Sequence, residues 1–333
     1  MEEKFQWLAT ISAPQEYPME IYDGALRSDD FTYSFDAIWG TQNTGWGNSG
    51  GTMSVDTKEM EIPHTLEFTY YSLVEKKFYT GKWDLDKEKI EKLFQNGVTN
   101  RLDGKKGNYN EFKIGLAPKG RVVLWINGEG YQKEVGVFQA HETVLNKDQA
   151  YENAQYMLED DYAEQRLKSN VLLQKDVKER IANFGYPNVD IYNTFRNKFN
   201  WNTIIELPTG YKVENGSYLF CNGEWDDLKN LNKKPIPYAI NLNISNTDGQ
   251  KNGVDIIFTQ DQKYRKNYSL KGNNVLPVDF DLNEIFEIFS KNITPDENAE
   301  LLIKVNPQNK ELSISLKQNE KIFLLKKNVS KIF

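Results

Sequence analysis

The sequence predicts a β-rich α+β fold made of two modules, each an antiparallel sheet covered by a helix. Aromatic residues make up 13% of the 333-residue chain, a proportion that suits pleated, half-buried strands better than a helical bundle. Alternating apolar segments are separated by turns rich in proline and glycine, and only short stretches show helical spacing. The chain also exceeds the usual length of a single domain, so two modules with separate cores are expected.

The first module is expected over residues 1–145. Leu66–Tyr79 alternates as two strands do, and Asp84 or Asp86 can start the helix that Gly97 ends. The apolar face of this helix carries Ile90, Leu93 and Phe94. Next come a hairpin and a third strand, with turns at Pro118-Lys119-Gly120 and Gly128-Glu129-Gly130. An antiparallel meander with the helix on one side is the expected assembly.

A helical connector is expected over residues 146–200, where the composition shifts to Glu, Lys, Gln, Ala and Leu. Its apolar residues fall at helical spacing: Tyr156, Leu158, Tyr162, Leu167, Val171, Leu172, Val177 and Ile181. Gly185 and Pro187 close this stretch, and a further amphipathic helix is expected from Ile191 to Phe199. The acidic run Glu159-Asp160-Asp161 fits a solvated helix face better than a metal site.

The second module is expected over residues 201–333. Its strands are expected at Thr203–Leu207, Ser217–Cys221, Tyr238–Ile244, Val254–Thr259 and Tyr264–Leu270. Asp281-Leu282-Asn283-Glu284 has the form of a capping box before a helix that carries Ile285, Phe286, Ile288 and Phe289. Leu301–Ile314 then forms a hairpin.

The order of strand, helix and hairpin is the same in both modules, which predicts a degenerate tandem repeat. In the helices, Ile90, Leu93 and Phe94 match Ile285, Ile288 and Phe289. In the hairpins, Ile114, Leu116, Pro118, Val123 and Trp125 match Ile303, Val305, Pro307, Leu312 and Ile314. Identities are few, so convergent use of a common helix-on-sheet plan remains the alternative.

Charge and composition exclude several classes of protein. The net charge is −7, and Lys and Arg are scattered among acids, so nucleic acid is not an expected partner. Cys221 is the only cysteine, which excludes an internal disulfide and a cysteine-rich metal site. No apolar run approaches the ~20 residues of a membrane span. This chain is therefore expected to be soluble.

Two groups of residues are candidates for a binding surface. Glycine-rich residues 39–51 lack the Lys-Ser/Thr ending of a phosphate loop, but the tryptophans of this segment could stand out from it as an aromatic platform. The candidate aromatic platform consists of Trp39, Trp46 and Trp83. The second group is a short acidic and aromatic run made of Glu224, Trp225, Asp226 and Asp227.

The residues for common catalytic chemistry are sparse. The chain has only two histidines, His64 and His141, so neither a Ser-His-Asp nucleophile nor a zinc site is expected. Paired carboxylates remain an option for a hydrolase, with Glu75 near Tyr79 and Glu224 near Asp226 as candidates. No catalytic residue, metal site or cofactor is therefore predicted.

Several motifs together resemble the bacterial family called domain of unknown function 2931. These motifs are Tyr71-Ser72-Leu73-Val74-Glu75-x-Lys77-Phe78-Tyr79-x-Gly81, Leu93-Phe94-x-x-Gly97, Gly115-Leu116-Ala117-Pro118-x-Gly120-x-Val122-Val123-x-Trp125 and Phe138-Gln139-Ala140-x-Glu142. Later similar segments are Gly185-Tyr186-Pro187 with Tyr192, Phe195-Arg196 and Phe199-Asn200-Trp201, and Asn222-Gly223-Glu224. The resemblance spans roughly Tyr17 to Glu224.

The resemblance implies an exported envelope lipoprotein of a Gram-negative bacterium. The N-terminal lipidation cysteine of such proteins is absent from this chain, so contact with the membrane is expected only through a lipid anchor preceding it. Some members appear beside genes for secreted antibacterial effectors, and the family brings no catalytic residues. We therefore expect a non-enzymatic envelope protein that binds a secreted toxin as an immunity or inhibitor protein. The alternatives are a glycan- or ligand-binding lipoprotein and a carboxylate-based hydrolase.

Overall fold

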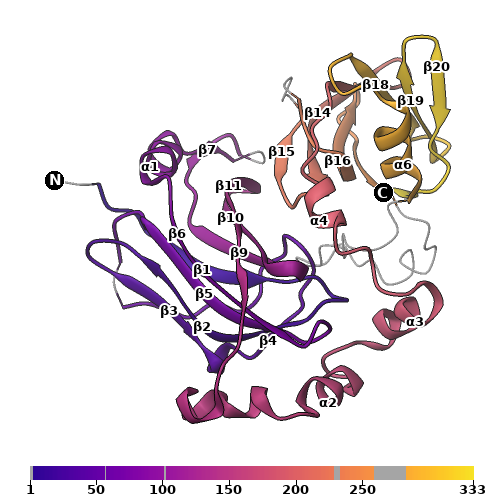
Figure 1. Ribbon diagram of the computed structural model, residues 1–333. Coiled ribbons are helices and arrows are strands. Elements are labelled where there is room, and N and C mark those ends of the chain that lie inside the picture. The colour runs from indigo at the N-terminus through magenta and orange to yellow at the C-terminus, as the bar shows by residue number, and fades with distance from the viewer. Residues whose placement is uncertain (1–2, 57, 101–102, 229–232, 259–282) are drawn as a thin grey trace. The chain divides into compact units, whose positions relative to one another are not determined.

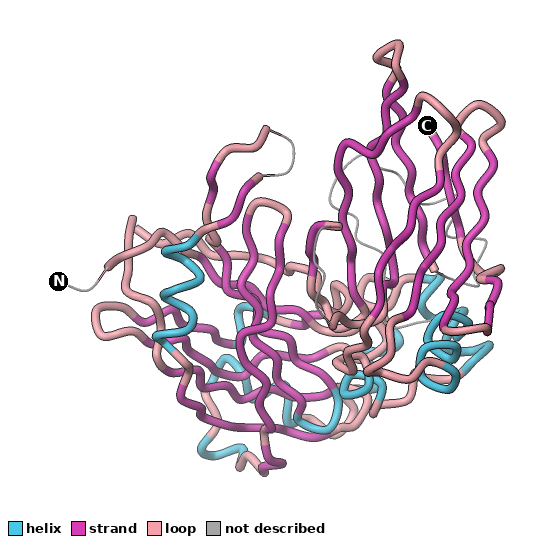
Figure 2. Tube along the Cα trace, turned by 90° about the horizontal axis from the view of Figure 1, so that it is seen from above, coloured by secondary structure: helices cyan, strands magenta, loops and turns pink. Residues whose placement is uncertain are grey.

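The computed structural model describes residues 3–56, 58–100, 103–228, 233–258 and 283–333 (Figure 1). The chain divides into two compact units, one of residues 1–100 and 104–192 and one of residues 101–103 and 193–333. Strands dominate both (Figure 2), and helices are few and short. The β-rich α+β prediction is confirmed.

The first unit contains two groups of paired strands. One group runs in the order β1-β9-β10-β11, with β1 parallel to β9 and the other neighbours antiparallel. Its strands are β1 (Leu8–Ser12), β9 (Glu111–Ala117), β10 (Arg121–Gly128) and β11 (Tyr131–Gln139). The other group is antiparallel in the order β12-β6-β5-β2-β3, with β4 also paired to β2. Its strands are β12 (His141–Thr143), β6 (Lys77–Asp84), β5 (Thr65–Ser72), β2 (Met19–Arg27), β3 (Thr32–Asp36) and β4 (Thr41–Gln42).

Both predicted turns of the meander are confirmed. The short 3₁₀ turn η2 (Pro118–Gly120) connects β9 to β10, and Lys119 adopts a left-handed conformation there, with φ of 58°. Glu129 and Gly130 connect β10 to β11 with φ of 52° and 81°, as a two-residue hairpin turn of type I′ requires.

The predicted helix is α1 (Lys87–Asn96), which covers the face of β9. The Asp86 side chain caps it by accepting a hydrogen bond of 3.1 Å from the Lys89 N–H, and Gly97 follows its last residue with φ of 62°. Ile90 and Phe94 are buried, as predicted, whereas Leu93 is half-buried. The Phe94 ring stacks on Phe112 of β9 at 5.5 Å.

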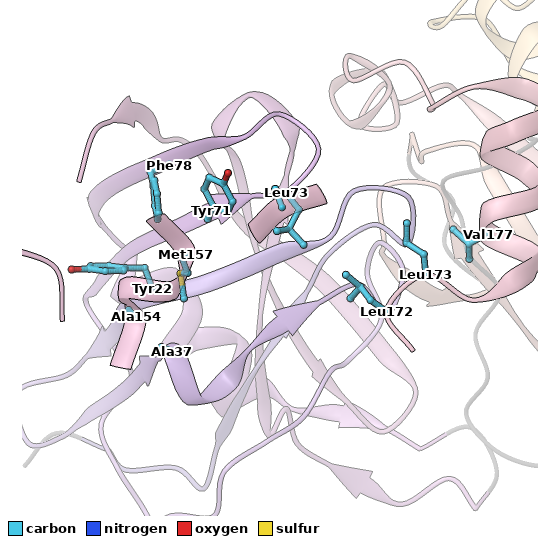
Figure 3. Close-up of a cluster of buried hydrophobic side chains, with 11 residues drawn as sticks. Tyr22, Ala37, Tyr71, Leu73, Phe78, Ala154, Met157, Leu172, Leu173 and Val177 are labelled. Atoms are coloured by element: carbon cyan, nitrogen blue, oxygen red, sulfur yellow. The ribbon is translucent and has the colours of Figure 1, made fainter. Parts of the chain in front are cut away.

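The helical segment after β12 packs within the first unit up to Tyr192, instead of standing apart as a connector over residues 146–200. It contains η3 (Lys147–Gln149), η4 (Glu152–Leu158), α2 (Tyr162–Lys168), α3 (Lys175–Phe184) and α4 (Ile191–Thr194). Figure 3 shows its apolar side chains beside those of the sheet formed by β2, β5 and β6. This shared cluster is Tyr22, Ala37, Tyr71, Leu73, Phe78, Ala154, Met157, Ala163, Leu172, Leu173 and Val177. One-sided helices of this length need such a surface to bury their apolar faces. Val171, predicted on the apolar face, is instead 93% exposed.

The second unit also has two groups of strands. The first runs β13-β18-β19-β20, in which β13 is parallel to β18 and the rest are antiparallel. Its strands are β13 (Trp201–Glu206), β18 (Ala299–Asn306), β19 (Glu311–Gln318) and β20 (Lys321–Leu324). The other group runs β21-β17-β16-β14-β15, all antiparallel. It consists of β21 (Val329–Ile332), β17 (Lys251–Ile257), β16 (Pro237–Asn246), β14 (Tyr211–Phe220) and β15 (Trp225–Asp227).

The helix of the second unit is α6 (Asn283–Asn292), with Ile285 and Phe289 buried and Ile288 half-buried. The hairpin predicted at Leu301–Ile314 is confirmed as β18 and β19. The strand expected at Tyr264–Leu270 and the first two residues of the predicted capping box, Asp281 and Leu282, lie outside the described residues.

The two units share one topology, which supports the predicted tandem repeat. Each pairing named above for the first unit, apart from that of β4, has a counterpart of the same direction in the second, from β1·β9 with β13·β18 to β6·β12 with β17·β21. Even an irregularity recurs, because β2 shifts register between Ile21 and Asp23 and β14 does so between Val213 and Asn215. A tight turn, a helix and a hairpin follow in the same order in both.

The strand registers correct part of the residue matching by one position. Ile114 lies opposite Leu124 in the first unit, and Ile303 lies opposite Ile314 in the second. Leu124 is therefore equivalent to Ile314, and Val122 to Leu312, where the sequence had suggested Trp125 and Val123. The matching of Ile114 with Ile303 is retained, and it makes Ile11 equivalent to Ile205 through the parallel pairs.

Candidate binding surface

In the first unit, one face of the β1-β9-β10 sheet is covered by a segment of the same chain. Residues 43–52 run antiparallel beside β1, the end strand of the group. Gly45 N–H donates to the Ala13 carbonyl at 2.8 Å, and Gly50 N–H donates to the Ile11 carbonyl at 3.0 Å. Thr52 forms a further bridge with Thr10. We call residues 43–52 the covering segment.

Trp46 anchors the covering segment. Its ring is 1% exposed and makes edge-to-face contacts with Trp125 at 4.9 Å and Tyr192 at 5.1 Å. Gly115 lies beneath, and a Cβ added there would meet the rings of Trp125 and Trp46 at 2.3 and 3.0 Å. The expectation that Trp46 stands out as part of an aromatic platform is thus corrected. The small residue at position 115 lets its ring press onto the strand.

A buried lysine fixes the same segment from below. Lys113 is fully buried, and its ammonium donates to the Gly47 carbonyl at 2.9 Å and to the Gln132 side chain. Gln132 also donates to Gly47, at 2.9 Å. Burial lowers the pKa of Lys113 to about 8, and the nearby Glu111 carboxylate opposes that shift. Because its partners face the segment, we assign Lys113 a positioning role.

The remaining predicted tryptophans lie in two other environments. Trp39 packs on Phe35 at 4.8 Å, and Trp83 stacks on Phe138 at 5.3 Å; both are half-buried. Among the described residues, no ring contact joins any two of Trp39, Trp46 and Trp83. The structure therefore does not assemble the three into one platform.

Glu75 anchors a turn. Both of its carboxylate oxygens lie 3.1 Å from the backbone N–H of Lys119, and the Tyr79 hydroxyl donates to it at 3.2 Å. Gln139 donates to the Lys119 carbonyl at 2.6 Å, and Asp190 pairs with the Lys119 ammonium at 2.9 Å. Residues from separate motifs of the resemblance thus meet around one left-handed residue. Structural support explains these contacts without a second carboxylate for hydrolysis.

The predicted acidic and aromatic run forms a turn and the short strand β15 in the second unit, and all four residues are half-buried. Glu224 accepts a hydrogen bond from Asn222 at 2.9 Å and lies 3.8 Å from the Lys198 ammonium. Asp226 favours the charged form of Lys234, whose pKa burial lowers to about 8. These acids therefore take part in local interactions of their own unit.

Sequence reasoning missed an acidic hollow in the first unit. Asp23 and Asp36 lie directly opposite each other on β2 and β3, and with Tyr151, Glu152 and Asn153 they line a cavity of about 580 Å³. Burial raises the pKa of Asp23. Among the described residues, no group of three or more His, Cys, Asp or Glu side chains is arranged to hold a metal ion.

Sequence reasoning also missed an exposed apolar face in the second unit. Ile204, Leu302, Ser315 and Leu324 lie side by side across the four strands β13, β18, β19 and β20. Ile204 is 39% exposed, Leu324 is 61% exposed, and Ile322, two residues from Leu324 on the same face, is 64% exposed. We call Ile204, Leu302, Ile322 and Leu324 the open face. Alternating residues that are apolar on both faces of Ile322–Leu324 were the available signal.

The open face is equivalent to the face that the first unit covers. By register, Ile204 matches Thr10 and Leu302 matches Lys113, and both of those residues are fully buried in the first unit. The covering segment belongs to the connection between β3 and β5, residues 37–64. The equivalent connection between β15 and β16 is the much shorter run of residues 228–236.

A cavity of about 380 Å³ lies at the end of this face. Its lining includes Glu206, Pro208, Lys304, Asn306, Glu311 and Ser313. The Lys304 ammonium pairs with the Glu206 carboxylate at 2.8 Å, and both side chains are about half exposed, so this pair contributes little to stability. The site therefore offers an apolar row with charged groups at one end.

Across the described part of the chain, no helix has the length and apolar character to cross a membrane. Comparison with curated proteins and with solved structures found no match. A family model does match: DUF2931, described as a protein of unknown function, covers residues 1–188, which ends four residues before the first compact unit does. Since that match extends over more than half of the sequence, the chain belongs to the DUF2931 family.

Proposed function

We propose that this chain is a non-enzymatic binding protein of the cell envelope, and that it neutralises a secreted antibacterial toxin by binding it through the open face of the second unit. The supporting observation is the exposure of Ile204, Ile322 and Leu324 on a face that the first unit buries. Contiguous apolar surface rimmed by polar groups is typical of protein interaction sites. The toxin as partner and the envelope as location come from the resemblance of the motifs.

The alternatives have less support. Glycan stacking requires an open aromatic face, and Trp46 is buried while Trp39 and Trp83 each pack on a neighbouring phenylalanine. Hydrolysis by paired carboxylates requires two free acids, whereas Glu75 is occupied by the Lys119 backbone and Tyr79.

Protection of cells tests the proposal. Bacteria that export the wild-type chain should survive the secreted toxin encoded beside its gene. The variant Ile322→Asp/Leu324→Asp, exported at the same level, should not protect, because two carboxylates on the open face oppose an apolar contact. The matched control is Val144→Asp/Val171→Asp, at positions 83% and 93% exposed in the first unit, and it should protect. Failure of the exported wild type to protect, or full protection by the open-face variant, would contradict the proposal.

The envelope location has its own test. The native reading frame should encode a signal peptide that ends in a lipidation cysteine just before the first residues of this chain. Metabolic labelling with a fatty acid should then mark the product of the full gene. A native start at Met1, with no leader before it, would rule out the envelope assignment.

A further inference from the structure

We propose that the second unit binds an extended segment of its partner that pairs with the edge of β13 and places a tryptophan side chain in the cavity beside Glu206 and Lys304. This inference deepens the proposed function and rests on it, because it states the chemistry of the partner at the open face. The template is inside the chain, where the covering segment does the same to β1 with Trp46.

The first step is the position of the cavity. In the first unit, Trp46 lies over Gly115, which pairs with Ser12 on one side and Val123 on the other. The equivalent three residues in the second unit are Lys304, Glu206 and Ser313. All three line the cavity of about 380 Å³. The hollow of the second unit therefore lies at the position that a tryptophan fills in the first.

The second step is the strand edge. β13 ends its group of strands, as β1 does in the first unit. The carbonyls of Ile11 and Ala13 accept hydrogen bonds from the covering segment, and their equivalents are Ile205 and Leu207. In the described residues no separate segment forms a bridge with β13 comparable to that of Thr52 with Thr10. An extended peptide added to such an edge gains main-chain hydrogen bonds, while a side-chain pocket supplies specificity.

The third step is the choice of side chain. Register places Ser315 where the first unit has Trp125, so a large ring of the chain itself is replaced by a small residue and the space is open to a ring from outside. The Lys304 ammonium can approach an aromatic face, and the Glu206 carboxylate can accept an indole N–H. This combination favours tryptophan over phenylalanine, which has no N–H to donate.

The experiment uses the full chain with labelled isoleucine and leucine methyl groups, followed by nuclear magnetic resonance. The probe is a synthetic peptide that copies residues 43–52 of this chain, Asn-Thr-Gly-Trp-Gly-Asn-Ser-Gly-Gly-Thr. An indole ring in the cavity should shift the methyl resonances of Leu302 and Leu312 through its ring current. A peptide with Ala in place of its tryptophan should bind at least tenfold more weakly, and one with Phe should bind severalfold more weakly.

Blocking the cavity supplies the chain-side test. Ser313→Phe should weaken peptide binding at least tenfold because its ring occupies the cavity. The same substitution at an exposed position of α6, Ser290→Phe, should leave binding unchanged. Glu206→Ala removes the acceptor without adding bulk, and it should reduce the preference for tryptophan over phenylalanine.

The outcomes separate the two proposals. No methyl shift at millimolar peptide, or equal binding of the Ala peptide, would overturn the tryptophan inference while leaving the protection assay free to support the open face. Tryptophan-dependent binding that Ser313→Phe abolishes would support the inference. If Ser313→Phe then leaves protection from the toxin intact, the cavity binds such segments but the proposed function does not use it, and this inference about the partner fails.

Discussion

Trp7 and Trp201 occupy equivalent places in the two units, each buried beside the start of a strand that runs parallel to the first strand of a hairpin. Trp7 contacts Phe112 at 5.1 Å, and Trp201 contacts Phe289 of the covering helix at 5.8 Å. The residues two positions earlier are also equivalent, because Phe5 meets Phe94 and Phe199 meets Phe289, both edge-to-face at 5.3 Å. The helix-covered core is thus repeated, whereas the opposite face of the sheet has diverged.

The repeated core predicts similar losses from equivalent substitutions. Phe94→Ala and Phe289→Ala should each destabilise their unit by ~3–5 kcal/mol, because each leaves a cavity between helix and sheet. Denaturant unfolding, followed separately in each unit, measures both values. Val171→Ala, at an exposed position, should change the free energy of unfolding by less than ~0.5 kcal/mol. A loss below ~1 kcal/mol for either phenylalanine would contradict the assignment of these rings to the core.

Lys113 predicts a pH dependence of stability. Its pKa is lowered to about 8 in the folded chain, whereas an unfolded lysine titrates near ~10.4. Between these values the unfolded state binds more protons, so the contribution of Lys113 to stability rises with pH through this window and is lost as pH falls below about 8.

The measurement compares wild type with Lys113→Met at pH 7 and pH 10. The difference in unfolding free energy should move in favour of the wild type at the higher pH, by on the order of 2 kcal/mol. The comparison isolates Lys113 from Lys234, whose pKa is also lowered to about 8 and which both proteins retain. A pH-independent difference would show that the burial of Lys113 does not shift its titration.

Glu75 predicts a local effect on the first unit. Glu75→Ala removes the acceptor of the Lys119 N–H and of the Tyr79 hydroxyl, and should destabilise the first unit by ~1–3 kcal/mol. Lys119→Gly should relieve the left-handed conformation and partly restore the loss. Thermal unfolding of the single and double variants checks both. If Glu75→Ala leaves stability unchanged but abolishes function, a direct functional role for this carboxylate would replace the structural one.

The net charge of −7 predicts that association with a basic toxin slows as salt rises, since exposed charges are screened beyond ~8 Å at physiological ionic strength. The acids Glu159, Asp160 and Asp161 belong to the first unit, and Glu224, Asp226 and Asp227 belong to the second. Reversing the charge of one triplet at a time, with stopped-flow measurement of the association rate, shows which of them steers the partner. A rate that ignores both salt and these reversals would refute electrostatic steering.

Local patterns predicted local elements well. The turns at Pro118–Gly120 and Glu129–Gly130, the helix ended by Gly97 and the hairpin of β18 and β19 are each specified by residues within a few positions. The helical segment was visible as well, but its place was not. Its periodicity identifies an apolar face and does not identify the sheet that covers this face.

Long-range pairing limited the rest. The parallel pair of Ile11 with Ile114 joins residues about a hundred positions apart, and no turn connects them to set the register. The exposure of Trp46 was predicted from its glycine-rich surroundings, yet Gly115, far away in sequence, decides that its ring is buried. The open face was invisible for the same reason, because it is defined by the absence in one unit of a cover that the other unit has.

The most direct test of the account is the dissociation constant between the full chain and the secreted toxin encoded beside its gene, measured for wild type and for Ile322→Asp/Leu324→Asp. Both proteins should fold alike, because these side chains are 64% and 61% exposed. The account predicts a dissociation constant at least a hundredfold higher for the variant, about 2.7 kcal/mol of binding free energy, with no change for Val144→Asp/Val171→Asp. Equal affinity of the wild type and the open-face variant would contradict it.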